Sequence, residues 1–407
     1  MHPMLKPALR RAWRDLRSVQ FGATSAHAVV VGPIDTTTGS LLGLLDGTRG
    51  VELLRAEARA LGLRDGVLEE LLGRLARAGL IADASAGRPG KAGGAGRTGG
   101  PGGAGRTSGS GGPGGAGAVA SRDDALDPLR ADLASLSVAH PEPDGALRRV
   151  AARRAARVQV RGAGRVGAAV AALLSASGVG RVDVLDSGSV RPWEVAPGGL
   201  PAEAVGERRA AAAHRLVARS APGGRPPRAP RRVTGELGRE PGLSLVVVTP
   251  RDGLAAYLPD PVPAEGWIAT GTPHLYAGVV EATGVVGPLV LPGGTACARC
   301  AQEERTDREP AWPRMLAQWR SGPPAQVPAC DLGLAATVAG LAAAHALAFL
   351  DGELPSSTGA RWEVSLPLLE WRVERMRPHP ACPCGAGRRG EGEHASGAEM
   401  PQDTMAG

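Results

Sequence analysis

Residues 158–167 read VQVRGAGRVG, and this stretch decides the fold of the central part of the chain. Val158–Val160 predicts a strand, and the apolar run after the glycines predicts a helix. Between the two, Gly162 permits a tight turn, Gly164 lets backbone amides approach a phosphate, and Gly167 lets the helix pack closely on the strand. The stretch therefore predicts a doubly wound α/β unit that binds a nucleotide.

The next strand supports a nucleotide fold. The helix is expected to end near Gly178, and Val182–Asp186 predicts a second strand. Asp186 ends that strand 19 residues after Gly167, where a carboxylate would reach a ribose hydroxyl. These residues alone also fit an NAD-dependent oxidoreductase.

Three further segments indicate which class of nucleotide-binding protein this is. They read VRPWEVAPGGLPAEAVGERRAAA at 190–212 and SLVVVTPRD at 244–252, and GGTACARC follows at 293–300. In this order they resemble the ThiF/MoeB superfamily, the adenylating domain shared with ubiquitin-activating enzymes, over about residues 155–385. The resemblance implies that the glycine loop and Asp186 hold ATP with magnesium, and that the C-terminus of a small protein is adenylated. The cysteine arrangement and the lack of a catalytic His or Lys context disfavour an oxidoreductase.

Several adenylation residues of that family are replaced here. The family's Asn, Arg and Gln fall on Glu194, Pro197 and Gly198, and its Lys falls on Arg209, which keeps the charge but changes the geometry. Glu194 puts a negative charge where a phosphate would lie. We therefore expect a nucleotide site that is degenerate in catalysis.

The magnesium ligand is also displaced. The family's Asp falls on or beside Arg251, and Asp252 comes one residue late. Because phosphoryl chemistry needs cations that neutralise the transferring group, the only catalytic candidates left are Arg209 and Asp252. The predicted cofactor-binding residues are Gly162, Gly164, Gly167, Asp186 and Arg209.

Four of the five cysteines form two tight pairs. Cys297 and Cys300 make a Cys-x-x-Cys knuckle, and the second pair, Cys382-x-Cys384, begins 82 residues after Cys300. Four thiolates suit tetrahedral zinc. Since four protein ligands leave no open position for water, we predict a structural zinc site that ties the C-terminal segment to the domain.

Three other residues are candidates for chemistry. Cys330 precedes a long apolar helix with Asp331 as a possible cap; a helix N-terminus lowers a thiol pKa, but a small core residue is the favoured interpretation. His274 is expected to line the pocket, and His345 to be a satisfied helix histidine. Neither has a nucleophile or carboxylate partner in the sequence, so no triad is assigned.

The N-terminal part predicts a separate module. Val19–Gly22 and Ala28–Val31 are β-prone, Thr36–Thr38 is a candidate helix cap, and Val51–Leu61 and Val67–Leu80 carry leucines at helical spacing. Strands followed by short helices suggest a winged-helix-like module, with a wing strand beginning at 79–81. The expected organisation is a small winged-helix-like α+β module at 1–83, a disordered Gly-rich linker at 84–122, a Rossmann-like ThiF domain with structural zinc at 123–385, and a disordered tail at 386–407.

A narrower resemblance concerns GVVGPLVLPGGTACARC at 284–300, REPAWPRMLAQW at 308–319 and PHPACPC at 378–384. These segments look like actinobacterial ThiF-like proteins related to the leader-peptide-binding partners of azoline-forming cyclodehydratases. The resemblance implies a precursor or leader peptide added as a strand at residues 19–31, a modifying-enzyme partner, and a homodimer. The alternative is an active ATP-dependent adenylyltransferase that activates a ubiquitin-like sulfur-carrier protein.

Composition limits the remaining classes. The net charge of +7 does not gather on one predicted helix: Val67–Leu80 balances Glu69 and Glu70 against Arg74 and Arg77, which disfavours nucleic acid. The N-terminus lacks the apolar core of a signal peptide. Leu332–Leu350 is expected to be a buried helix rather than a membrane span. We therefore expect a soluble, cytoplasmic protein.

Overall fold

The computed structural model describes residues 1–85, 126–224, 242–322 and 327–389. They form two compact units that interleave along the chain. One unit holds Met1–Pro7 and Asp35–Asp127, and the other holds Ala8–Ile34 and Pro128–Gly407. The predicted linker lies outside the described residues apart from its first two, at 84 and 85.

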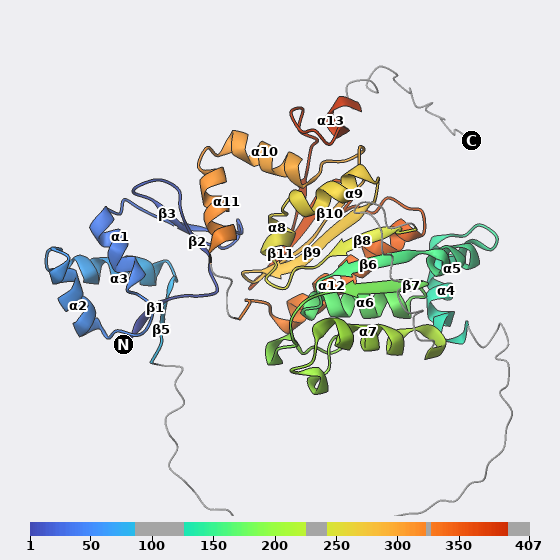
Figure 1. The fold of residues 1–407 in the computed structure, drawn as a ribbon, viewed down its shortest axis with the longest axis horizontal. Coiled ribbons are helices and arrows are strands. Elements are labelled where there is room, and N and C mark those ends of the chain that lie inside the picture. The colour runs from blue at the N-terminus through green and yellow to red at the C-terminus, as the bar shows by residue number, and fades with distance from the viewer. Residues whose placement is uncertain (86–125, 225–241, 323–326, 390–407) are drawn as a thin grey trace, which may run out of the picture. The chain divides into compact units, whose positions relative to one another are not determined.

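A seven-stranded mixed sheet forms the centre of the larger unit, in the order β12-β11-β10-β9-β8-β6-β7 (Figure 1). The neighbours β9, β8, β6 and β7 run parallel, and β10, β11 and β12 continue the sheet antiparallel. The bounds are β6 Arg157–Arg161, β7 Arg181–Leu185, β8 Leu245–Val248, β9 His274–Val280, β10 Thr283–Val290, β11 Ala360–Ser365 and β12 Glu370–Arg375. The loop after β6 therefore lies at the carboxyl ends of the parallel strands, where such sheets bind ligands.

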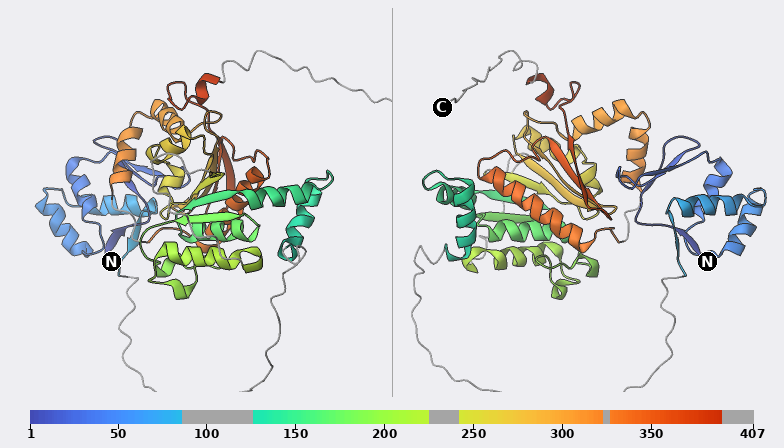
Figure 2. Two further views of the ribbon diagram at one scale, coloured as in Figure 1. Left: turned by 45° about the vertical axis from the view of Figure 1, so that its right-hand side comes forward. Right: turned by 180° about the vertical axis from the view of Figure 1, so that it is seen from behind.

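Helices cover both faces of this sheet. On one face α6 packs against α12 and α7, and Figure 2 (right) shows α12 crossing in front of the strands; α8 packs on β9 and β10 from the opposite face (Figure 1). The bounds are α4 Arg130–Ala139, α5 Gly145–Ala155, α6 Arg165–Ala176, α7 Arg209–Ser220, α8 Leu254–Tyr257, α9 Glu265–Ala269, α10 Ala298–Arg308, α11 Trp312–Ser321, α12 Leu332–Leu350 and α13 Ala386–Arg389. The layers are those expected from the glycine stretch.

The strand β9 shows how the core is divided between the two faces. All seven of its residues are buried. Leu275, Ala277 and Val279 belong to the large cluster that includes α6 and α12, whereas Tyr276 and Val280 pack on the other side. A strand covered on both faces needs apolar residues at odd and even positions alike, which explains why it does not alternate.

The helix α12 is apolar enough, and at 19 residues long enough, to cross a membrane by length and composition alone. Its inner residues, among them Leu334 and Val338, instead belong to the sheet-facing core. Asp331 caps it by accepting a hydrogen bond from the Leu334 amide at 3.0 Å, as the sequence predicted.

A three-stranded antiparallel sheet near the N-terminus belongs to the larger unit. It consists of β2 Arg11–Trp13, β3 Val19–Phe21 and β4 Val29–Val31, in the order β2-β3-β4. The Gln318 side chain of α11 covers the outer edge of β2: its Oε1 accepts from the Trp13 amide at 2.9 Å, and its Nε2 donates to the Trp13 carbonyl at 3.0 Å. The edge of β4 has no paired strand among the described residues.

Glu281 fixes this small sheet to the turn between β9 and β10. It is 5% exposed and sits at φ 49°, in the left-handed region. Its carboxylate accepts from the backbone amides of Arg10 at 2.8 Å, Ala23 at 2.6 Å and Thr24 at 3.3 Å. Ala12 and Ala23 also pack in one cluster with the tryptophans of α11. Residues 8–34 therefore form an integral layer of the larger unit.

The smaller unit is built from two short strands and three helices. Its bounds are β1 Pro3–Leu5, β5 Ile81–Asp83, α1 Thr36–Gly43, α2 Val51–Ala60 and α3 Val67–Arg77. Most of the predicted leucines form its core, with Leu54 and Leu75 fully buried, but Leu53 in α2 and Leu61 at its C-cap are exposed, at 52% and 39%. The predicted threonine cap is wrong by one residue: Asp35 caps α1, and its carboxylate accepts from the Thr38 amide at 2.6 Å.

The N-terminal module remains a prediction in its winged-helix form. The predicted strands at 19–31 belong to the larger unit, whereas the three predicted helices belong to the smaller one. At the other end, Ala386–Arg389 forms α13 where the tail was predicted to begin; the rest of that tail lies outside the described residues.

Candidate functional site

The glycine loop between β6 and α6 is shaped by close packing. Gly162 sits at φ +108°, and a Cβ there would lie 1.9 Å from the Thr249 carbonyl oxygen. A Cβ on Gly167 would lie 2.0 Å from the Gly162 carbonyl oxygen, whereas one on Gly164 would meet only the Arg251 side chain, at 3.3 Å. Two of the three glycines are therefore required by the fold itself, whether or not a phosphate binds.

There is little room for a phosphate at the N-terminus of α6. The cavity lined by Gly164 to Gly167, Pro250 and Cys330 has a volume of about 10 Å³, roughly the space of one water. Arg165 bounds it and donates to the Cys330 carbonyl at 2.6 Å. The backbone amides of this helix end face a nearly filled space.

Asp186 follows β7, where the sequence placed it, but its carboxylate is already occupied. One oxygen accepts from the Ala163 amide of the glycine loop at 2.6 Å, and the other accepts from the Ser187 amide at 2.6 Å and from Arg209 Nε at 3.1 Å. The side chain is 4% exposed. These contacts use the oxygens that a ribose would need.

Arg209 begins α7 and is buried among anionic partners. Its Nη1 donates to both Glu194 oxygens, at 3.0 and 2.7 Å, and to the Ser189 carbonyl. Its Nη2 donates to the Ser187 carbonyl. The Arg209 and Glu194 side chains are 3% and 8% exposed. Each of the three nitrogens of this buried arginine thus donates within the chain, to two carboxylates and two carbonyls.

Arg251 completes the charge balance. Its nitrogens lie 3.8 Å from Asp186 and 3.9 Å from Glu194, and its side chain is 45% exposed. We call Asp186, Glu194, Arg209 and Arg251 the arginine–carboxylate cluster. Its two positive and two negative charges cancel.

A cavity of about 840 Å³ lies beside this cluster, with Gly162, Asp186, Glu194 and Arg251 in its wall. Its third carboxylate, Asp252, accepts from Arg10 at 2.9 Å. Each carboxylate of the wall is thus paired with an arginine, which leaves the cavity poorly suited to hold magnesium. The wall also holds Arg161, Arg191, Trp193, Ser187, Leu185, Pro250 and Pro328.

The four paired cysteines come together as predicted. Their sulfurs all lie within 4.8 Å of one another, with separations of 3.8 Å for Cys297–Cys300 and 3.6 Å for both Cys297–Cys382 and Cys300–Cys384. Thiolates at ~2.3 Å from a tetrahedral zinc would lie ~3.8 Å apart, so the donor set fits this ion. Cys297 and Cys300 lie at the start of α10, and the other pair lies in the segment after β12.

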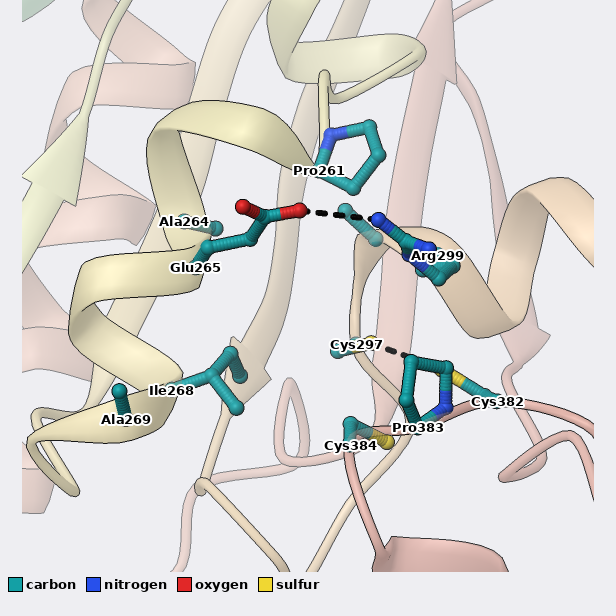
Figure 3. A pocket seen from close by; sticks show the side chains of 11 residues that line it. Pro261, Ala264, Glu265, Ile268, Ala269, Cys297, Arg299, Cys382, Pro383 and Cys384 are labelled. Atoms are coloured by element: carbon teal, nitrogen blue, oxygen red, sulfur yellow. Dashed lines mark hydrogen bonds and ion pairs between the residues drawn. The ribbon is translucent and has the colours of Figure 1, made fainter.

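The surroundings of the cysteine cluster agree with a structural role. Burial raises the pKa of the Cys382 thiol to about 11, a cost that a bound cation would remove by stabilising the thiolate. A mostly apolar pocket of about 330 Å³ adjoins it, with Ile268, Pro383 and the Glu265–Arg299 ion pair around it (Figure 3). Four cysteines would leave a zinc no open position for catalysis.

Three sequence expectations are decided by burial. Burial raises the pKa of Cys330 to about 11, which favours the protonated thiol at neutral pH and agrees with the favoured interpretation as a small core residue. His274 is fully buried in β9 and does not line the large cavity, contrary to expectation. His345 is buried, but its Nδ1 has no hydrogen-bond partner among the residues that the structure describes, so these residues do not satisfy it as was expected.

Sequence reasoning missed the partners of the site residues. It placed Glu194 and Arg209 separately on family positions, but not in one buried pair 15 residues apart. It also missed the pairing of Arg10 with Asp252, which are 242 residues apart. The Glu194–Arg209 pair had a signal in the sequence, because both residues depart from the expected family pattern in charge or shape. The Arg10–Asp252 pair had no such signal.

The fold and the site define a class: a domain of nucleotide-binding architecture with a four-cysteine cluster at its C-terminal end. The model of the ThiF family matches residues 145–384. This chain belongs to the ThiF family. No curated protein matches it.

Solved structures of two proteins are similar in fold. Escherichia coli MccB with MccA-N7isoASN is 14% identical, with 95% of this chain and 100% of that chain covered and a TM-score of 0.49; MccB with ATP is 14% identical, with 95% and 99% covered and a TM-score of 0.47. PaaA is 13% identical, with 91% and 99% covered and a TM-score of 0.47. Likeness at this level does not extend to activity.

Proposed function

We propose that this ThiF-family protein binds a precursor or leader peptide for a modifying enzyme and no longer adenylates. The observation that carries the proposal is the arginine–carboxylate cluster. In it, Arg209 donates to both Asp186 and Glu194, so the residues expected to hold the ribose and the phosphates of a nucleotide are bound to partners within the chain. Adenylation needs preorganised cations at the phosphates and a metal ligand. The candidates for these roles, Arg209 and Asp252, are instead paired with Glu194 and Arg10 within the chain.

The exchange of pyrophosphate into ATP tests the catalytic half of the proposal. Adenylation joins an acceptor carboxylate to the α-phosphorus of ATP and releases pyrophosphate, so labelled pyrophosphate enters ATP only if the step is reversible on the protein. We expect no exchange above background with magnesium and candidate acceptor peptides. Exchange that requires both the protein and a peptide would overturn it.

The peptide half rests on the edge of β4. The opposite edge of the same sheet is covered by Gln318, whereas β4 offers unpaired backbone groups among the described residues. Its central residue, Val30, is 52% exposed. An exposed edge with an apolar side chain is the geometry that accepts an added strand.

Fluorescence anisotropy with labelled peptides from neighbouring short reading frames tests this edge. Val30→Glu places a charge on the strand edge and is expected to weaken binding tenfold or more. Leu53→Glu is a matched control, because Leu53 is equally exposed, at 52%, but lies in the helix α2. Equal effects of the two substitutions would exclude β4 as the peptide site.

One observation favours the second candidate, an active adenylyltransferase for a small carrier protein. The 840 Å³ cavity still has Gly162 and Asp186 in its wall, and it is large enough for a nucleotide. The two candidates separate in isothermal titration. Heat on adding ATP with magnesium, lost on chelating the magnesium, would favour the enzyme; its absence together with peptide binding favours the binding protein.

A further inference from the structure

The pocket beside the cysteine cluster opens onto its sulfurs. Cys297, Cys382 and Cys384 line this pocket, whereas Cys300 is fully buried behind them. Cys297 and Cys382 are also buried, but Cys384 is only half-buried. Figure 3 shows Ile268 of α9 on one side of the pocket and Cys384 on the other. A molecule in the pocket would therefore lie against the most accessible sulfur of the cluster.

The rest of the pocket wall selects an uncharged molecule. Ile268, Ala269 and Pro383 give it an apolar lining, and its two charged residues, Glu265 and Arg299, are paired with each other at 2.9 Å. A charged group that enters such surroundings loses hydration without gaining a free partner. The volume of about 330 Å³ lies at the lower end of the range for small-molecule sites. The pocket therefore suits a small, uncharged, largely apolar ligand.

We propose that this pocket admits a small uncharged disulfide and that Cys384 is the residue modified by it. Thiolates attack disulfide sulfurs wherever the disulfide can reach them, and the pocket brings an apolar molecule against Cys384. The sulfurs in the wall are thus the groups that react with this ligand, and the apolar lining is what holds it. The inference goes beyond the proposed peptide binding and does not depend on it.

The modification proceeds in two exchange steps. In the first, the Cys384 thiolate attacks one sulfur of the disulfide; a bond forms between these two sulfurs, the S–S bond of the ligand breaks, and its other half leaves as a thiolate with the electron pair. In the second, the thiolate of Cys300, whose sulfur lies 3.6 Å from that of Cys384, attacks the Cys384 sulfur, and the bound half leaves as a second thiolate. Two cysteine thiolates are oxidised to one disulfide, and the ligand is reduced to two thiolates.

The position of Cys300 determines what the modification does to the fold. Cys300 lies in α10, and Cys384 lies in the segment between β12 and α13, so the new disulfide joins the two segments that a zinc would join. Two of the four ligands of a zinc held by the cluster would be removed, and the ion would be released. The C-terminal segment therefore stays attached to α10, by a covalent bond in place of a metal.

The reaction rates of the zinc-loaded full chain with two disulfides test the pocket. Dithiodipyridine is uncharged, whereas dithiobis(nitrobenzoate) carries two carboxylates, and the absorbance of the released thiol compound gives each rate. Each rate is divided by the rate of the same reagent with N-acetylcysteine, which removes the difference in intrinsic reactivity. We expect the corrected rate to be at least tenfold higher for dithiodipyridine. Equal corrected rates, or a faster reaction of the anion, would overturn the inference.

The product of the reaction identifies the modified residues. Peptide mass spectrometry should find Cys300 joined to Cys384, and a chromogenic chelator should detect zinc release as this disulfide forms. Cys330 is an internal control, because it is also half-buried but lines a cavity of only about 10 Å³; it should remain a free thiol. Zinc release without the Cys300–Cys384 disulfide, or modification of Cys330 before Cys384, would contradict the proposed site.

Ala269→Trp should block the pocket. Ala269 lines the pocket and is exposed, so a larger side chain can occupy the space without entering the core. We expect the rate with dithiodipyridine to fall tenfold or more while the zinc content and the circular-dichroism spectrum stay unchanged. Val262→Trp is the control, because Val262 is 64% exposed and does not line the pocket; it should react like the wild type. Ala269→Leu repeats the test if the tryptophan displaces the zinc, and a wild-type rate in a zinc-loaded Ala269 variant would overturn the inference.

Discussion

At the scale of single residues, the hydrogen bonds and ion pairs of Asp186 and Glu194 define the arginine–carboxylate cluster. Asp186 has three hydrogen-bond partners within the chain, and Glu194 has Arg209. Burying such a pair costs desolvation that the contact only just offsets, and removing one member leaves an uncompensated charge. Replacing one charged residue of the cluster should therefore lower the stability of the fold more than replacing all of them with apolar residues of similar size.

Arg209→Ala should lower the free energy of unfolding by about 3–5 kcal/mol, because Asp186 and Glu194 would stay buried without their cation. Denaturant unfolding followed by circular dichroism measures this. Arg251→Ala is the control: it faces the same two carboxylates, but at 3.8 and 3.9 Å and 45% exposed, so its loss should cost less than about 1 kcal/mol. Equal costs would show that Arg209 is not the central cation.

Two of the three loop glycines, Gly162 and Gly164, should differ sharply in their tolerance of a side chain. Gly162→Ala forces a Cβ to 1.9 Å from a carbonyl oxygen at positive φ, and we expect it to lower the melting temperature severely or prevent folding. Gly164→Ala meets a flexible side chain at 3.3 Å and should cost less than about 1 kcal/mol. If Gly164→Ala proves the more damaging in thermal melts, the loop is not shaped by packing.

His274 should make stability depend on acidity. Burial lowers its pKa from 6.5 to about 4, so between these values the unfolded chain binds a proton that the folded chain does not. The free energy of unfolding should fall as pH drops from 6.5 to 4, by up to about 3 kcal/mol, and this term is constant below that window. His274→Phe should remove this part of the slope in melts across the window; an unchanged slope would contradict it.

The role of a residue could be predicted from the sequence where the residues that it contacts lie near it in the chain. The glycine spacing and the strand-end Asp186 follow from local geometry, and the cysteine pairs from ligand chemistry. The burial of His274 and the pairing of Arg10 with Asp252 arise from contacts between distant segments, which no local pattern encodes.

At the scale of elements, the cysteine cluster joins the start of α10 to the segment between β12 and α13. If it holds zinc, the purified protein should contain about one zinc per chain, and Cys382→Ser should lose the metal and melt at a lower temperature. Elemental analysis and thermal melts measure both, with Cys330→Ser as the control that keeps its zinc. Metal retained at full occupancy in Cys382→Ser would contradict a four-cysteine site.

The elements with a local signal were predicted well. The order strand, glycine loop, helix, strand placed β6, α6 and β7 to within a few residues, because the apolar runs and the glycines fix them. The antiparallel half of the sheet has no comparable local signal, since β10 and β11 are buried by α12 and pair across more than 70 residues of chain. Where that pairing falls depends on tertiary contacts.

At the scale of the whole molecule, the two compact units do not follow one another along the chain, because each contains two separate segments. Residues 8–34 were predicted to lie in one module with the helices that follow, but they form a layer of the larger unit. Glu281 holds that layer through three backbone amides. Long-range attachment of this kind cannot be read from local periodicity.

Glu281→Ala should release this layer selectively. Hydrogen exchange at the amides of Arg10, Ala23 and Thr24 should accelerate, because a buried carboxylate acceptor is lost, while amides of β6 and α6 stay protected. Mass spectrometry of peptides from the two regions measures the difference. Uniform acceleration over the larger unit would indicate global destabilisation instead.

The pairing of Arg209 with Asp186 and Glu194 also limits how this sequence can evolve. A lysine at 209 would keep the charge but could not make the separate contacts that the Arg209 guanidinium makes with Asp186, Glu194 and two carbonyls. An asparagine at 194 would leave the positive charges in excess, and an aspartate at 251 would place a third carboxylate near Asp186 and Glu194. Neighbouring sites coupled in this way do not contribute additively. Single substitutions that rebuild this cluster should therefore pass through less stable intermediates, so the cluster resists stepwise change.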